Sequence, residues 1–317
     1  MAPSEELKPY LHRIERALGL ELTWSTCERL GGLTNRNFRL DCPQGSFVLR
    51  IAGEGTADYL NRAHEEINAR VASQAGVNVE ILFFDAEDGT SLCRFLPEAR
   101  TMDREAFRDS QALRRAGRLL RQLHSCGREF ANRFELFEQI DRYQAVLREK
   151  GADLPPGYAQ VQQWAQRVRR ALAGHSLPSA PCHCDPLAEN FLHDGQRMYL
   201  IDFEYSGNND PMWDLGDLSV EAHFTAEQDE ELLRGYFGGP APLLERARMV
   251  MYQAMCDLLW TLWGVVQHAN GNPADDFWAY AVGRLERCRR LMAQLAFEEY
   301  LAFLEAPVAE PRTNQPR

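Results

Sequence analysis

Residues 182–204 read CHCDPLAENFLHDGQRMYLIDFE, and Asp194-Gly195 separates two short apolar runs in this stretch. An Asp-Gly pair between such runs is a strong signal for a β-hairpin. We therefore predict paired strands at 191–192 and 198–201. Such a hairpin would bring Asn190 close to Asp202, with Asp185 just upstream of both.

The three polar residues around this hairpin form a pattern that is typical of phosphoryl transfer. In protein kinases, an aspartate orients and deprotonates the attacking hydroxyl, while an asparagine five residues later and the aspartate of Asp-Phe-Gly hold magnesium. Asp185 and Asn190 have that spacing here, and Asp202 begins Asp-Phe-Glu instead. No activation segment of the protein-kinase kind separates the motifs, which favours a small-molecule substrate.

Two other interpretations of this stretch are weaker. Cys182, His183 and Cys184 could bind zinc, but adjacent residues rarely point at one ion and no Cys-x-x-Cys pair completes a site. Asp202 alone could be a turn residue and Asn190 alone a helix cap. The joint spacing around a hairpin favours the kinase interpretation over both.

The composition is that of an ordinary globular protein. The chain has 317 residues, of which 45% are hydrophobic and 26% charged, with a formal net charge of −11. An acidic chain does not indicate a nucleic-acid partner, but it is compatible with a cationic substrate. We see no run of about 18 apolar residues and no secretory leader, so we expect no membrane insertion. Eight scattered cysteines favour reduced thiols and a cytoplasmic location.

The first 96 residues contain a second set of candidate residues, for nucleotide binding. Residues 30–40, LGGLTNRNFRL, place a Gly-Gly turn between two strands, where backbone N–H groups can approach phosphate oxygens. Arg50 lies in an apolar strand run, at the position where kinases carry a phosphate-binding lysine. In the helix expected at about 59–75, either Glu65 or Glu66 could pair with Arg50, and we favour Glu65.

The same region predicts a second hairpin and then a boundary. Residues 79–84 and 90–95 flank Asp88-Gly89, and Leu96-Pro97 ends the second strand. We expect a small, mostly β lobe at 1–96, a larger helical lobe at 97–305 and a flexible tail at 306–317. The linker near Phe95 would contact adenine through its backbone. The predicted nucleotide-binding residues are Thr34, Asn35, Asn37, Arg50, Glu65 and Phe95.

Apolar periodicity predicts helices at 5–19, 103–125, 134–150, 157–173, 226–237, 241–268 and 273–304. His124 at the end of one helix is interpreted as a capping or core residue. Asp214 follows a segment that begins as a loop, and we interpret it as a helix N-cap or a loop anchor. Trp260 and Trp263 are three residues apart, and such aromatics more often belong to a core than to a binding site. An aromatic cage nevertheless suits a quaternary ammonium ion.

Several motifs together resemble one family, the choline/ethanolamine kinases and in particular their bacterial LicA-type members, within the aminoglycoside-phosphotransferase-like superfamily. The similarity extends over about residues 28–290. It is carried by the following segments: GGLTNRNF at 31–38; FVLRI at 47–51 followed by Gly53-x-Gly55-Thr56; Asn61-Arg62; His183-x-Asp185 to Asn190; IDFEYSG at 201–207 with Asp214-Leu215-Gly216; and Trp260-x-x-Trp263 with Tyr280-Ala281.

The resemblance implies an α+β, protein-kinase-like fold with two lobes, and transfer of the γ-phosphate of ATP to choline. By motif position, Asp185 would be the base, and Asn190 and Asp202 the Mg²⁺ ligands. Other substrates remain open: ethanolamine, another amino alcohol or an aminoglycoside. A nucleotide-binding pseudokinase is a further alternative, which the intact catalytic residues disfavour. The expected substrate residues are Glu204, Glu221, Phe224, Trp260, Trp263 and Tyr280.

Overall fold

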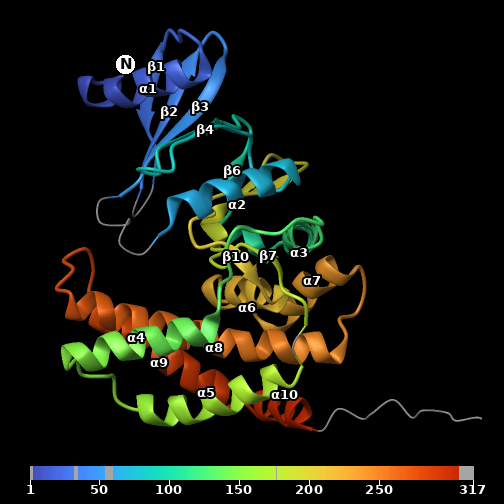
Figure 1. Ribbon diagram of the computed structural model, residues 1–317. Helices are drawn as coiled ribbons and strands as arrows, with labels where there is room; N and C mark the ends of the chain where they lie inside the picture. The colour runs from blue at the N-terminus through green and yellow to red at the C-terminus, as the bar shows by residue number, and fades with distance from the viewer. Residues whose placement is uncertain (1–2, 32–34, 54–59, 176, 307–317) are drawn as a thin grey trace, which may run out of the picture. The chain divides into compact units, whose positions relative to one another are not determined.

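The computed structural model describes residues 3–31, 35–53, 60–175 and 177–306. Two compact units make up the chain (Figure 1). The first unit comprises Met1–Phe134 and Ser179–Pro240, and the second comprises Glu135–Pro178 and Ala241–Arg317. The predicted lobe boundary at residue 96 falls inside the first unit and stays a prediction.

A five-stranded antiparallel sheet occupies the N-terminal part of the first unit, in the order β1-β2-β3-β5-β4. Its strands are β1 (Thr26–Arg29), β2 (Arg36–Cys42), β3 (Gly45–Ile51), β4 (Ile81–Phe84) and β5 (Ser91–Arg94). The hairpin predicted at 79–84 and 90–95 is confirmed as β4 and β5, and the expected run at 46–51 is β3.

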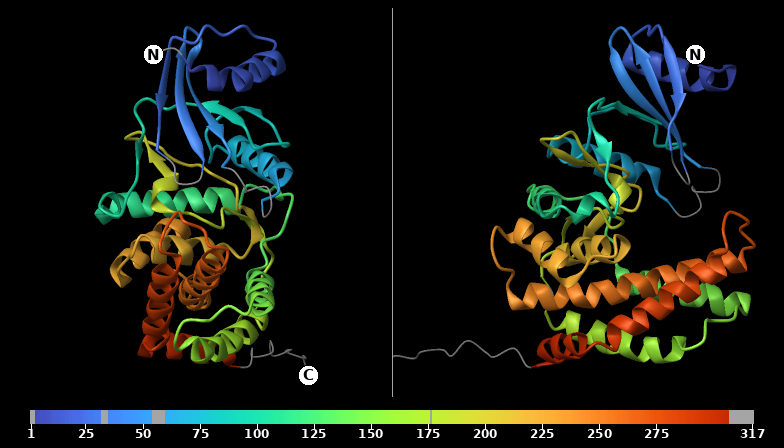
Figure 2. Two further views of the ribbon diagram at one scale, coloured as in Figure 1. Left: turned by 90° about the vertical axis from the view of Figure 1, so that its left-hand side faces the viewer. Right: turned by 180° about the vertical axis from the view of Figure 1, so that it is seen from behind.

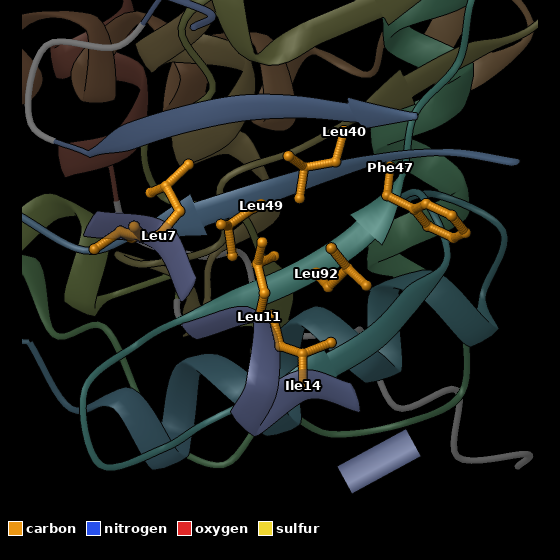
Figure 3. Close-up of a cluster of buried hydrophobic side chains, with 8 residues drawn as sticks. Leu7, Leu11, Ile14, Leu40, Phe47, Leu49 and Leu92 are labelled. Atoms are coloured by element: carbon orange, nitrogen blue, oxygen red, sulfur yellow. The ribbon is translucent and has the colours of Figure 1, made fainter. Parts of the chain in front are cut away.

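Helix α1 (Lys8–Leu18) and the short η1 (Glu5–Leu7) cover one face of this sheet, as predicted for residues 5–19. Leu7, Leu11 and Ile14 recur at helical spacing and are buried. In Figure 3 they lie against side chains of the sheet, which are Leu40, Phe47, Leu49 and Leu92. Burial of this apolar face stabilises the sheet that carries Arg50.

Among the described residues, the rest of the first unit holds two small sheets, four α-helices and short 3₁₀ turns. The hairpin of the opening motif is confirmed: β8 (Phe191–His193) pairs with β9 (Met198–Leu200), and β6 (Arg100–Thr101) pairs with β8. Strand β7 (Ala180–Cys182) pairs with β10 (Gly207–Asn209). The helices are α2 (Arg62–Gln74), α3 (Ser110–His124), α6 (Pro211–Glu221) and α7 (Ala226–Phe237).

The second unit is helical, and its helices lie side by side (Figure 2). They are α4 (Leu136–Lys150), α5 (Tyr158–Ala173), α8 (Leu243–Ala269), α9 (Phe277–Met292) and α10 (Leu295–Glu305). Helix α8 is long and apolar enough to cross a membrane by length and composition alone. However, 89% of its most apolar 18-residue stretch is buried, as in the core helix of a globular unit.

Three helix predictions need correction. The segment after residue 205 begins outside a helix, as expected, but α6 then starts at Pro211, which is earlier than an N-cap at Asp214 implies, since proline is well suited to the first turn. Its N-cap is Asp210, whose side chain accepts from Met212 N at 3.0 Å, so Asp214 is not the cap. The helix expected at 273–304 is two helices, because the chain turns at Ala293 and Gln294. Residues 103–125 hold a short 3₁₀ turn, Ala106–Arg108, before α3 begins.

Helices α3 and α7 pack so closely that their crossing admits only glycine. A Cβ atom added at Gly117 would lie 2.3 Å from Leu232 O, and one added at Gly235 would lie 2.4 Å from Arg114 O. Both contacts are with backbone atoms, which cannot rotate away.

We therefore expect Gly117→Ala to destabilise the protein by about 1–3 kcal/mol, since the two helices must separate. Gly283→Ala is the matched control, because a Cβ there meets nothing within 4 Å. This second variant should gain about 0.5–1 kcal/mol from lower backbone entropy in the unfolded chain. Urea unfolding followed by circular dichroism measures both, and equal midpoints for the two variants would contradict the close crossing.

Candidate active site

The hairpin β8–β9 joins the two predicted catalytic motifs through main-chain and histidine contacts. Ile201 N donates to Asn190 O at 3.0 Å, so the backbone of Asn190 lies beside the residue that precedes Asp202. The predicted closeness of Asn190 to Asp202 itself stays a prediction. His183 is fully buried, and its Nε2 donates to Ile201 O at 2.9 Å. Burial lowers the pKa of His183, so its ring is neutral and carries its hydrogen on Nε2. The segment before Asp185 is therefore fixed to the segment before Asp202.

Asp214 anchors the same loop from the other side. Its fully buried carboxylate accepts from His183 N at 2.7 Å and from Cys184 N at 2.9 Å. Trp213 Nε1 donates to Cys184 O at 3.1 Å. Cys184 and Asp202 both have a φ of 68°, which is unfavourable for residues other than glycine and persists where surrounding contacts enforce it. Of the two interpretations of Asp214, helix N-cap and loop anchor, the structure supports the loop anchor, because its carboxylate holds the backbone of the loop before Asp185.

His124 is a core residue, as one of its two interpretations stated, and not the helix cap, which is Ser125. Its Nε2 lies 3.0 Å from Asp214 Oδ2 and donates to it, because a carboxylate only accepts. Its Nδ1 lies 3.0 Å from the hydroxyl of Tyr236. His124 therefore connects α3 and α7 to the residue that holds the catalytic loop.

Arg50 on β3 links two acidic residues from distant parts of the first unit. Its Nη1 donates to Asp202 Oδ1 at 2.9 Å, and its Nη2 donates to Glu65 on α2. The pairing expected with Glu65 is present. Glu66 pairs instead with Arg70, four residues further along the same helix.

Arg62 is a member of this network to which the sequence analysis gave no role. Its buried Nη1 donates to Glu65 Oε2 at 2.5 Å and to Glu204 Oε2 at 3.2 Å. The spacing of Arg62 and Glu65, three residues apart on one helix, was a readable signal. Asn35 Nδ2 also donates to Glu204, at 3.3 Å, and Asn35 Oδ1 accepts from Gly53 N at 3.2 Å.

The charges in this network leave it with an excess of negative charge. Three carboxylates, those of Glu65, Asp202 and Glu204, face the two guanidinium groups of Arg50 and Arg62. Burial raises the pKa of Asp202 and of Glu204 above the usual carboxyl values, and repulsion between the carboxylates raises them further, while both arginines oppose the shift. A bound cation would relieve this repulsion.

The oxygen atoms present fit Mg²⁺, a hard cation that prefers carboxylate and amide oxygens. Carboxylate oxygens of Glu65, Asp202 and Glu204 all lie within 4.8 Å of one another. Asn190 Nδ2 donates to Asp185 O at 3.0 Å, so its amide oxygen is the atom left for a metal.

The remaining nucleotide-binding predictions concern residues with other contacts. Asn37 pairs with Arg50 across β2 and β3, and its Nδ2 donates to Gly31 O at 3.0 Å. The backbone N–H of Phe95 donates to Ser46 O, and Arg39 lies over its ring at 4.4 Å. Thr34 lies outside the described residues.

The predicted substrate residues fall into two sets, one in each unit. Glu204, Glu221 and Phe224 belong to the first unit, where Glu204 takes part in the charge network and Glu221 ends α6. The ring of Phe224 packs on Phe107, with their centroids 5.5 Å apart.

Trp260, Trp263 and Tyr280 belong to the second unit, on α8 and α9, and the structure brings these three together. The ring centroid of Trp263 lies 5.8 Å from that of Trp260 and 5.8 Å from that of Tyr280. Phe277 adds a fourth ring, 5.4 Å from Trp263. Trp260 is buried, whereas Trp263 and Tyr280 are half-buried, so two of the rings keep accessible surface.

The zinc alternative gains no support from the geometry. His183 uses its Nε2 on a carbonyl oxygen, and burial raises the pKa of Cys182 and Cys184 well above the usual thiol value, which disfavours thiolate ligands. Among the described residues, which include all eight cysteines, no disulfide is formed.

Comparison with known proteins identifies close relatives. Residues 26–250 match the phosphotransferase enzyme family, APH. Protein LicA of Haemophilus influenzae is 29% identical over 272 residues, covering 84% of this chain and 79% of the relative. A choline/ethanolamine kinase family protein of Mesorhizobium loti is 53% identical in its crystal structure and superposes with a TM-score of 0.82, covering 88% and 92% of the two chains.

A second solved structure, choline kinase LicA of Streptococcus pneumoniae, is 29% identical and superposes with a TM-score of 0.75. The match covers 92% of this chain and 99% of that one. These similarities confirm the predicted α+β, kinase-like fold, with its small antiparallel sheet near the N-terminus and its helical C-terminal region.

The charge network predicts a large effect of replacing Arg62. We expect Arg62→Met to destabilise the protein by about 3–5 kcal/mol, because it removes a shared partner from two largely buried carboxylates. Arg70→Met is the matched control: it removes an arginine–glutamate pair from the same helix, with side chains 38% and 28% exposed. That loss should be at most about 1 kcal/mol. Urea midpoints compare the two, and similar losses would mean that Arg62 is not an essential partner.

Proposed function

Because the chain belongs to the phosphotransferase enzyme family and, within it, to the choline/ethanolamine kinase family, we propose that it transfers the γ-phosphate of ATP to the hydroxyl group of choline. The coarser statement, that it is a kinase of small-molecule alcohols, follows from the family itself. The observation that carries the proposal is the contact between Asn190 O and Ile201 N, which joins Asp185 and Asn190 to Asp202.

Asp185 is proposed as the base. It follows the residue that Asp214 and Trp213 hold, so its backbone position is fixed while its side chain is only half-buried. In the reaction, the substrate oxygen bonds to the γ-phosphorus and the bond from that phosphorus to the β–γ bridging oxygen breaks, releasing ADP. The hydroxyl proton passes to the Asp185 carboxylate.

Asn190 and Asp202 are proposed to hold Mg²⁺, and Arg50 to contact the phosphates. When bound, Mg²⁺ would neutralise part of the negative charge of the phosphates. Arg50 suits its role because its planar guanidinium can make two parallel contacts with phosphate oxygens. The ion pair with Glu65 on α2 restricts the positions that the guanidinium group of Arg50 can adopt.

The cationic end of the substrate is proposed to bind the rings of Trp260, Trp263 and Tyr280. A quaternary ammonium group has no N–H to donate, so ring faces stabilise it better than a carboxylate alone. The half-buried surfaces of Trp263 and Tyr280 are the accessible part of this cluster. Glu221 and Phe224 remain candidates for the same role.

The direct test is phosphorylation measured side by side with choline, ethanolamine, another amino alcohol and an aminoglycoside. We expect the highest kcat/KM with choline and a requirement for Mg²⁺. A higher kcat/KM for ethanolamine would replace choline by that substrate. Nucleotide binding without turnover of any of these compounds would favour a pseudokinase.

Asp185→Asn should lower kcat by about 10²–10⁴-fold, because the amide cannot accept the hydroxyl proton. The affinity for ATP, measured by titration calorimetry, should stay nearly unchanged, since Asp185 is not among the proposed phosphate or metal contacts. Glu189→Gln is the control, an exposed carboxylate in the same loop, and should keep the activity of the natural sequence. A kcat near that of the unmodified enzyme in Asp185→Asn would exclude Asp185 as the base.

A further inference from the structure

A buried ion network lies beside the aromatic cluster of the second unit. Asp257 on α8 is fully buried and accepts from two arginines on α9. Arg284 Nη1 reaches Asp257 Oδ1 at 3.1 Å. Arg287 makes more contacts with the same carboxylate, through Nε at 2.8 Å and Nη2 at 2.6 Å. The carboxylate is therefore held mainly by Arg287.

Arg284 differs from Arg287 because it also holds Tyr280. Its Nε and Nη2 both donate to the Tyr280 hydroxyl, at 3.0 and 2.9 Å, and its guanidinium carbon lies 5.1 Å from the centroid of that ring. On the opposite helix, Gly264 leaves room for the ring, since a Cβ there would lie 2.8 Å from Tyr280 Cδ1. Trp263 contacts the ring edge-on. Tyr280 is thus restrained at its hydroxyl and along its ring.

The contacts of Asp257 with Arg284 and Arg287 also determine the net charge next to the aromatic cluster. One buried carboxylate faces two guanidinium groups, so the Asp257 network carries no unneutralised negative charge. A primary ammonium ion needs acceptors for its three N–H donors, and Asp257 is already committed to the arginines. A methylated ammonium ion needs only apolar contact and ring faces.

We propose that Arg284 is a positioning residue that holds Tyr280 in place and thereby makes the aromatic cluster select methylated over primary ammonium groups. The inference rests on the proposed function for its substrate. Two effects of Arg284 oppose each other: its charge repels a bound cation, while its hydrogen bonds keep the ring in the binding geometry. The geometric effect dominates, because cation–π attraction depends on where the ring face lies, while Asp257 offsets part of the positive charge of the two arginines.

The test uses the full chain with Arg284→Met, Arg284→Lys, Tyr280→Phe and, as matched control, Arg287→Met. Both arginines contact Asp257, and Arg284 also holds the Tyr280 hydroxyl. We expect Arg284→Met and Arg284→Lys to raise KM for choline about three- to tenfold, with KM for ATP and kcat little changed and KM for ethanolamine raised less. Arg287→Met should change KM for choline less than twofold, although it removes more contacts from Asp257.

The double variant Arg284→Met with Tyr280→Phe should be no worse than Arg284→Met alone, because Arg284→Met already removes both hydrogen bonds that Tyr280→Phe removes. Equal effects of Arg284→Met and Arg287→Met on KM for choline would overturn the proposal, since a general loss of stability would then explain both. An Arg284→Lys variant with the KM of the unmodified enzyme would also overturn it, because charge alone would suffice.

Binding of tetramethylammonium, followed by tryptophan fluorescence, separates this inference from the proposed function. If the unmodified protein binds tetramethylammonium more tightly than methylammonium and Arg284→Met loses that preference, the inference stands even when choline is not phosphorylated. If the unmodified protein phosphorylates choline but Arg284→Met keeps the preference for tetramethylammonium, the inference fails while the proposed function stands. No preference in the unmodified protein would overturn the inference as well.

Discussion

The carboxylate of Asp214 is the contact on which the catalytic segment depends. It is fully buried, and it accepts from two consecutive backbone N–H groups and from His124 Nε2. A buried carboxylate is costly unless such donors surround it, so the loss of any one of the three contacts would destabilise the others. They hold Cys184 in an unfavourable backbone conformation directly before Asp185. The cost of that conformation is offset by a network of α3, α6 and α7, so these helices bear on the geometry of the catalytic loop.

A second constraint is the charge network around Arg50. Unlike the contacts of Asp214, the charges in this network do not balance one another. The contacts of Asp214 are satisfied within the chain, whereas the three carboxylates around Arg50 and Arg62 exceed the positive charge beside them. A buried ion network of this kind adds little stability compared with apolar residues of similar volume, although removal of one partner is costly, and it is often kept for function. The raised pKa values of Asp202 and Glu204 have the same origin, namely burial and mutual repulsion. The unbalanced charge therefore coincides with the site where the proposed cation would bind.

The sequence was informative where local rules dominate. Asp194-Gly195 between apolar runs predicted β8 and β9, and the spacing of Leu7, Leu11 and Ile14 predicted α1, because both signals are short-range. Helix α6 was missed since its first turn reads as a loop, with Asn209, Asp210 and Pro211 in succession. The role of Arg62 was missed because its second partner, Glu204, is 142 residues away. The sequence favoured Glu65 over Glu66 as the partner of Arg50. The choice depends on which face of α2 points toward β3, and the structure shows that this face carries Glu65.

The two units offer chemically different groups to a bound cation. In the first unit, Glu65, Asp202 and Glu204 offer oxygen atoms with excess negative charge, which suits a small, strongly hydrated ion such as Mg²⁺. In the second unit, the one carboxylate of the Asp257 network is neutralised by two arginines, and rings form the accessible surface beside it. Rings stabilise a large, weakly hydrated cation and discriminate against a metal ion, which would not exchange its water for them. Under the proposed function, this division would direct the metal–nucleotide and the organic cation to different groups, because carboxylates alone attract both.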